Sequence, residues 1–173
     1  MARHDFRQHP CGWSFRAPTE SDVRYVAAHM READRREVLR SDGLDPETVL
    51  RLSVAASRKC YAGVVGDGSV ACVFGASQVN LCDETATLWM LSSEAVSRRP
   101  REFAVGSLAG VDLLCRELPE VAEFWNFVDA EYAAALRWVE WLGGGFVHDW
   151  RFGRCGGVFR CFCLENPYHK KED

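Results

Sequence analysis

Residues 124–146 read FWNFVDAEYAAALRWVEWLGGGF and hold a strand, a helix and a helix stop in one continuous stretch. Aromatic and β-branched residues dominate 124–129, which predicts a strand. From Ala133 to Leu142 apolar residues recur at helical spacing, and Gly143 follows as a residue that tolerates the left-handed helix end. A strand, an amphipathic helix and then Phe146 in a new strand are typical of a layered α/β domain.

The flanking sequence extends this pattern into a mixed α/β (α+β) domain. Further strands are predicted at 13–16, 60–65, 70–76, 85–91, 146–152 and 158–165, and further helices from Thr19, from Asp45 and from Pro100. Residues 31–40 are charged nearly all round and predict a solvated helix, or a continuation of the one before. The predicted order β-α-α-β-β-β-α-β-α-β-β implies a mixed central sheet with helices on both faces. Residues 1–173 form a single domain in this interpretation, with an ordered core at about 13–165.

Composition narrows the classes of function. The net charge is −4, and the arginines are interleaved with Asp and Glu, so no nucleic-acid surface is expected. No uncharged stretch reaches the ~20 residues of a membrane-spanning helix, and the N-terminal residues lack the apolar run of a signal peptide. We therefore expect no membrane partner and a protein that is cytoplasmic or packaged from the cytoplasm.

The eight cysteines do not indicate a metal site. None forms a C-x-x-C pair, and no histidines stand at zinc-ligand spacing. Cys72 and Cys115 fall in apolar patterns and are expected to be small buried side chains. No metal is predicted.

The stretch 132–146 resembles the fourth-helix signature of the GCN5-related N-acetyltransferase (GNAT) family. Ala135, Glu140, Leu142 and Gly143 stand at the positions of that signature, and the element order agrees with the family's fold. The resemblance implies acetyl-CoA as cofactor if the protein is active, and an amine as acceptor.

A narrower likeness is to GNAT-like proteins of phages and prophages, related to internal core proteins of short-tailed phages. It rests on Trp89-Met90-Leu91-Ser92-Ser93-Glu94-Ala95-Val96, on the basic stretch 98–103, and on the spacing Leu142-Gly143-Gly144-Gly145-Phe146. This likeness implies phage structural proteins as partners.

The family's cofactor loop is altered in this chain. In the family, glycines there let backbone N–H groups approach the pyrophosphate at a helix N-terminus. The corresponding residues 92–103 contain no glycine, and Pro100 removes one amide donor. Arginine side chains could grip phosphate instead, or could simply face solvent or another protein. The resemblance places the candidate cofactor-binding residues at Leu91, Ser92, Arg98, Arg99, Arg101, Glu102 and Phe103.

The catalytic groups remain unassigned from the sequence. Val139 stands where many family members carry a tyrosine that protonates the leaving thiolate, and valine cannot do so. Tyr132 lies two helical turns away, at about 10 Å along the axis, which makes it a poor substitute. Glu32, Glu37 and His29 belong to the helices that border the family's acceptor site, and ordinary surface is the competing interpretation of each.

Two functions follow from these observations. The first is a GNAT-fold protein of phage or prophage type, with a degenerate acetyl-CoA site and a structural or protein-interaction role in virion assembly. The alternative is an active acetyl-CoA-dependent N-acyltransferase. The acceptor and the oligomeric state cannot be read from the sequence.

Overall fold

A computed structural model of the chain describes residues 12–78, 83–153 and 156–170. Its seven strands form one sheet in the order β1-β2-β3-β4-β5-β7-β6. The strands are β1 Ser14–Arg16, β2 Lys59–Val64, β3 Val70–Ser77, β4 Thr85–Ser92, β5 Glu123–Asp129, β6 Gly145–Phe152 and β7 Gly157–Glu165. The helices are α1 Glu20–Ala28, α2 Glu32–Ser41, α3 Pro46–Ala56, α4 Ala95–Arg98, α5 Pro100–Glu117 and α6 Ala133–Leu142.

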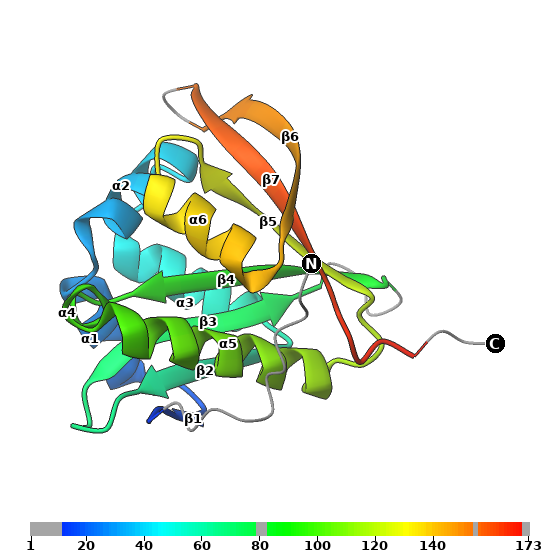
Figure 1. Cartoon of the computed structure of the whole chain (residues 1–173). Coiled ribbons are helices and arrows are strands. Elements are labelled where there is room, and N and C mark those ends of the chain that lie inside the picture. The colour runs from blue at the N-terminus through cyan, green and yellow to red at the C-terminus, as the bar shows by residue number, and fades with distance from the viewer. Residues whose placement is uncertain (1–11, 79–82, 154–155, 171–173) are drawn as a thin grey trace.

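Helices cover both faces of the sheet (Figure 1). Helices α5 and α6 lie on one face, whereas α1 and α3 pack on the other, against β3. Helix α2 continues the second layer toward the ends of β4 and β5. The fold is thus the expected mixed sheet between two helical layers.

One parallel pair interrupts an otherwise antiparallel sheet. Strands β4 and β5 are parallel and pair only over Thr85–Thr87 and Glu123–Trp125. Beyond this point the side-chain amide of Asn126 donates to the Leu88 carbonyl at 2.7 Å, in place of a main-chain ladder. The two strands therefore diverge, and the sheet has an opening at its centre.

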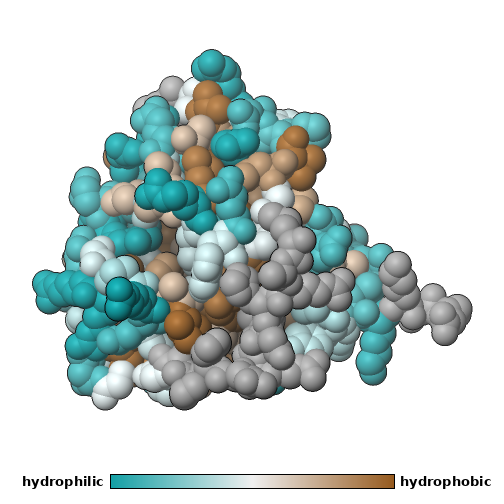
Figure 2. Space-filling model, in the orientation of Figure 1, coloured by the Kyte–Doolittle hydropathy of each residue, from teal (hydrophilic) through white to brown (hydrophobic). Residues whose placement is uncertain are grey.

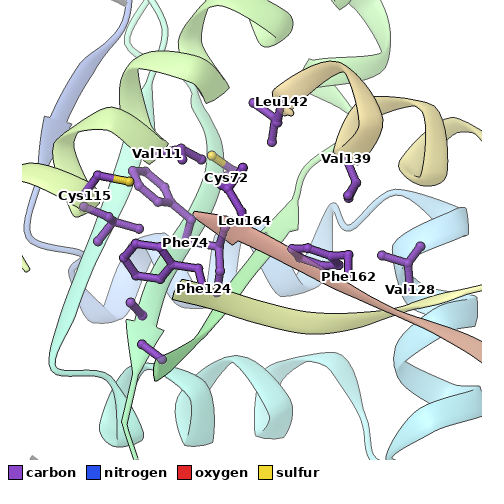
Figure 3. Close-up of a cluster of buried hydrophobic side chains, with 14 of the residues drawn as sticks. Cys72, Phe74, Val111, Cys115, Phe124, Val128, Val139, Leu142, Phe162 and Leu164 are labelled. Atoms are coloured by element: carbon purple, nitrogen blue, oxygen red, sulfur yellow. The ribbon is translucent and has the colours of Figure 1, made fainter. Parts of the chain in front are cut away.

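The larger core fills the space between the sheet and helices α5 and α6. Figure 3 shows Val111 and Cys115 of α5 and Val139 and Leu142 of α6 among side chains from the sheet, such as Phe162. A Cβ atom at Gly106 of α5 would collide with the indole of Trp13, so glycine is what lets this helix lie close to the N-terminal segment. The sheet and the two helices are one packed unit around the opening.

The helix stop predicted at Gly143 is confirmed: this residue is left-handed, with φ of 94°. Two details differ from the prediction. Residues 32–41 do form a helix of their own, α2, but it is not solvated all round, because Asp34 and Val38 are buried. A short helix, α4, precedes the helix that begins at Pro100. Within the described residues no helix is both long enough and apolar enough to cross a membrane.

Candidate functional site

A cavity of about 720 Å³ lies where β4 and β5 diverge. On one side its wall comes from α5 and α6, through Phe103 and Trp138, and on the other from α2 and α3, through Val38 and Val49. Figure 2 shows the α5–α6 face, on which hydrophilic residues predominate and hydrophobic residues reach the surface around α6 and β6. Since the two helical layers lie on opposite faces, the cavity connects both sides of the sheet.

The free edge of β4 directs main-chain groups into this opening. The Ser93 N–H donates to the Ala71 carbonyl on β3. On the other side, the Ser92 N–H donates to Asp34 of α2, and the Ser92 carbonyl accepts from the N–H of Arg31, which directly precedes α2. The Leu88 carbonyl also points away from β3, toward Asn126. Because main-chain direction alternates along a strand, the N–H and carbonyl of Met90, midway between Leu88 and Ser92, face the opening as well. The cavity therefore has a main-chain donor on its wall.

A buried carboxylate, Asp34, joins three elements at the inner end of the cavity. It accepts hydrogen bonds from the Ser92 N–H at 3.0 Å and the Ser92 hydroxyl at 2.8 Å. The Tyr132 hydroxyl donates to it at 2.8 Å, and Arg31 forms an ion pair with it at 2.7 Å. These four contacts tie α2 to the end of β4 and the start of α6.

Arg31 extends this network toward α5. Its guanidinium lies 5.9 Å from the ring centroid of Phe103 and 5.6 Å from that of Tyr132. Both distances suit cation–π contact. The Arg31 Nε atom is buried and has no hydrogen-bond partner among the described residues. One of its donors therefore remains unused at the cavity wall.

Glu37, one helical turn beyond Asp34, has different properties. Its side chain lines the cavity and accepts a hydrogen bond from the Asp129 N–H at 2.7 Å. Burial raises the pKa of Glu37 to about 7, and the nearby carboxylates of Asp34 and Asp129 act in the same direction. A carboxyl with this pKa exchanges protons near neutral pH, as a general base must.

The other candidate acids and bases are elsewhere or occupied. Glu32 and His29 are exposed and do not line the cavity. Tyr132 is buried, with its hydroxyl bound to Asp34, and burial raises its pKa above the usual range. Val139 is 1% exposed and packs in the core. Of the candidate groups named from the sequence, Glu37 alone combines the cavity wall with a titratable side chain that is available.

The predicted cofactor-binding residues occupy two different settings. Leu91, Ser92 and Phe103 line the cavity, although the N–H and hydroxyl of Ser92 are bound to Asp34. The other four lie outside the cavity wall, around the turn between α4 and α5: Arg98 ends α4, Arg99 forms the turn, and Arg101 and Glu102 belong to the first turn of α5.

The arginines of this turn differ in their partners. Arg99 pairs with Asp67 at 2.7 Å and with Glu102 at 3.6 Å. Arg98 and Arg101 are exposed, and neither has an ion-pair partner in the part of the chain that the structure describes. Two guanidinium groups are therefore available beside the cavity, and the third is held by the β2–β3 turn.

The sequence reasoning missed Arg31 and Asp34. The spacing of Asp34 from Glu37 was a usable signal, since residues three apart are neighbours on one face of a helix, and Arg31 directly precedes that helix. What concealed them was the charge of the whole stretch 31–40, which made each position look solvated. Trp138 was also missed as a site residue; its indole N–H donates to the Ser107 hydroxyl at 2.9 Å, and its ring lines the cavity.

Comparison with known proteins supports the fold alone. No family model matches the chain, and no curated protein matches its sequence. Solved structures do match along most of its length. A spermidine N-acetyltransferase from Vibrio cholerae, in complex with CoA and spermine, is 10% identical with a TM-score of 0.65, over 90% of this chain and 96% of that one.

Two other acetyltransferases agree with this result. The ribosomal-protein-S18-alanine N-acetyltransferase from Escherichia coli is 18% identical with a TM-score of 0.62, over 93% of this chain and 97% of that one. A putative phosphinothricin N-acetyltransferase is 14% identical with a TM-score of 0.67, over 92% and 99% of the two chains. The chain therefore has the GNAT acetyltransferase fold.

Proposed function

We propose that the protein is an acetyl-CoA-dependent N-acyltransferase that acts on an amine. The observation that carries the proposal is the cavity through the diverging strands, with Glu37 and the Met90 N–H on its wall. A cofactor entering from the α5–α6 side and an acceptor entering from the α2–α3 side would meet within it. The fold agrees with this function, and one structural neighbour is described as a complex with CoA.

The turn between α4 and α5 suits the phosphates of acetyl-CoA despite its lack of glycine. The first hydrogen bond of α5 runs from the Phe103 N–H to the Arg99 carbonyl, so the N–H groups of Arg101 and Glu102 lie outside the helix ladder. The Arg98 and Arg101 side chains add positive charge beside these amides. Together they would hold the pyrophosphate, while Phe103, Ala104 and Ala134 would border the acyl arm.

Acetyl-CoA, when bound, supplies an activated acyl group: a C–N bond forms at the thioester carbonyl carbon, the C–S bond breaks, and the thiol is released. Glu37 takes the proton that the amine loses. The Met90 N–H donates to the acyl oxygen, where negative charge develops. Asp34 keeps α2 and β4 in place, which keeps these two groups at a constant separation. Protonation of the departing sulfur is left to water, because Tyr132 is bound to Asp34 and Val139 has no proton to give.

A non-catalytic contact role in virion assembly is the competing function. The glycine-free turn favours it, because Pro100 and its neighbours occupy positions where the acetyltransferase family has bare backbone. The two functions differ in one requirement: the enzyme must bind acetyl-CoA, and the contact protein need not.

Calorimetric titration of acetyl-CoA into the purified protein tests the proposal. We expect a Kd on the order of 10 μM. Ala134→Trp should abolish the binding, since it puts an indole at an exposed position on the cavity wall. Ala133→Trp is the matched control, because Ala133 is also exposed but lies outside that wall. No heat at millimolar acetyl-CoA, or equal binding by both variants, would refute this site and leave the contact role.

A further inference from the structure

One sheet face beside α2 and α3 carries a row of aromatic side chains, contributed by β5, β6 and β7. Phe127 contacts Phe152 edge-on, with ring centroids 5.0 Å apart, and Phe152 stacks on Phe159 at 4.3 Å. Trp150 extends the row, 6.4 Å from Phe127. Phe159 is buried, whereas the other three are partly or largely exposed. Aromatic surface in this position is available for contact.

The cavity reaches this row on its α2–α3 side. Phe127, Phe152 and Phe159 belong to its wall, and Trp89 of β4 joins them. The indole N–H of Trp89 is already bound to the Ser57 hydroxyl at 2.8 Å, so the ring presents mainly apolar surface. Val38 and Val49 line the opposing side, together with the polar residues Ser41, Asp42 and Ser53. The acceptor half of the cavity therefore has aromatic rings on the sheet side and a mixed apolar and polar wall on the helix side.

Little negative charge remains in this half of the cavity. Asp34 is saturated by its four contacts, and Asp129 forms an ion pair with Arg40 at 2.9 Å. Glu37 is thus the carboxyl at the inner end, and the exposed Asp42 is the other acidic residue of the wall. A polyamine carries several cationic nitrogens along its length, and those that reach Val38 and Val49 would be desolvated without a carboxylate.

We infer that the acceptor is a primary amine carried on an aromatic or otherwise apolar body. Its amine lies beside Glu37, to which it loses one proton as the C–N bond forms, and its body packs between Phe127, Phe152 and Val49. This inference rests on the proposed function, and its tests separate the failure of one from the failure of the other.

An acceptor panel with acetyl-CoA gives the first test, using 2-phenylethylamine, spermidine and ethanolamine as probes. We expect kcat/KM for 2-phenylethylamine to exceed that for each of the other two by about 100-fold, because burying an aromatic body contributes a factor of this order. Faster acetylation of spermidine or ethanolamine would overturn the inference and leave the proposed enzyme standing.

A binding measurement does not depend on turnover. Saturation-transfer NMR with 2-phenylethylamine and the full chain should show contact of the phenyl protons with the protein. Phe127→Leu, which keeps most of the side-chain volume, should weaken this binding about fivefold, and Phe127→Ala about tenfold. Trp125→Ala is the control, since Trp125 neighbours Phe127 on the same strand but lies outside the cavity wall.

The outcomes are distinguishable. Binding that is weakened in the Phe127 variants and kept in Trp125→Ala supports the inference, even if acetyl-CoA fails to bind and the proposed function falls. Absence of phenyl contact, or equal weakening by Trp125→Ala, refutes it whatever acetyl-CoA does.

Discussion

The inner end of the cavity and the turn between α4 and α5 are built in opposite ways. Around Asp34, polar groups from α2, β4 and α6 bond to one another at fixed distances, in a buried setting. At the turn, Arg98 and Arg101 project from the surface without ion-pair partners in the described structure, and no glycine exposes the backbone. The inner end of the cavity is therefore held by buried contacts, whereas the proposed phosphate-binding turn depends on long side chains in water.

This difference predicts that the two regions respond differently to change. Removing one member of a buried network lowers the stability of the fold strongly, because the remaining partners stay buried and unpaired. Removing a single exposed cation has a small energetic effect, because its interactions are weakened by water and screened by salt. Substitutions in the first region should alter stability and rate, and substitutions in the second should alter cofactor affinity alone.

Removal of Asp34 is the largest expected perturbation. Asp34→Ala should lower the free energy of unfolding by about 3–5 kcal/mol, since Arg31 loses its ion-pair partner in a buried setting. Urea denaturation measures this change. Glu32→Ala, on the same helix and exposed, should cost about 1 kcal/mol or less. Similar losses in the two variants would mean that the network does not hold the cavity together.

Substitution of Glu37 tests whether the inner end of the cavity performs the chemistry. Glu37→Gln should reduce kcat for the best amine about 10²–10³-fold, because the amide cannot take a proton but can still accept from the Asp129 N–H. In the wild-type protein, kcat should rise with pH through about 7, where the carboxyl ionises. Glu32→Gln serves as the control. A wild-type pH profile that is unchanged by Glu37→Gln would exclude Glu37 as the base.

Substitutions at the proposed phosphate-binding turn should have a smaller, salt-dependent effect on the affinity for acetyl-CoA. The double substitution Arg98→Ala and Arg101→Ala should raise the Kd for acetyl-CoA about tenfold at low salt, and less at 0.5 M salt, because exposed charges are screened. Arg99→Ala should change the Kd less, since Arg99 is held by Asp67. Calorimetry at two salt concentrations checks both. An Arg99 effect as large as that of the double variant would contradict the assigned difference between these arginines.

The smallest expected effect is a gain in stability at alkaline pH. The pKa of Glu37 is raised in the folded state, so its stabilising contribution is complete below the unfolded value near 4.5 and is lost as pH rises through about 7. Glu37→Gln should therefore raise stability by about 1 kcal/mol at pH 8 and leave it nearly unchanged at pH 4.5. Thermal melts at both pH values measure this; a loss of Tm at pH 8 would argue against a desolvated carboxylate.

Local signals in the sequence were sufficient for most of the fold. The helix stop at Gly143 follows from a backbone conformation that glycine adopts easily, and its φ is positive. The functional site was harder to predict from the sequence. Glu37 appeared only as one of several charged residues, because nothing local distinguishes a carboxyl that becomes desolvated from one that stays in water. The arginines at 98–101 were correctly placed near a helix start, but their different partners depend on Asp67, which is 32 residues from Arg99.

The sequence by itself determined the order of the strands and of the longer helices, the mixed sheet and the absence of glycine from the turn before α5, since periodicity, caps and turn residues act between near neighbours. Only the tertiary structure decided that Asp34 is saturated, that Glu37 remains available and that Met90 directs its N–H into an opening. These properties arise where β4 and β5 stop pairing and α2 packs against their ends. Burial and alignment there involve groups 58 and 92 residues apart in the chain, which no local pattern records.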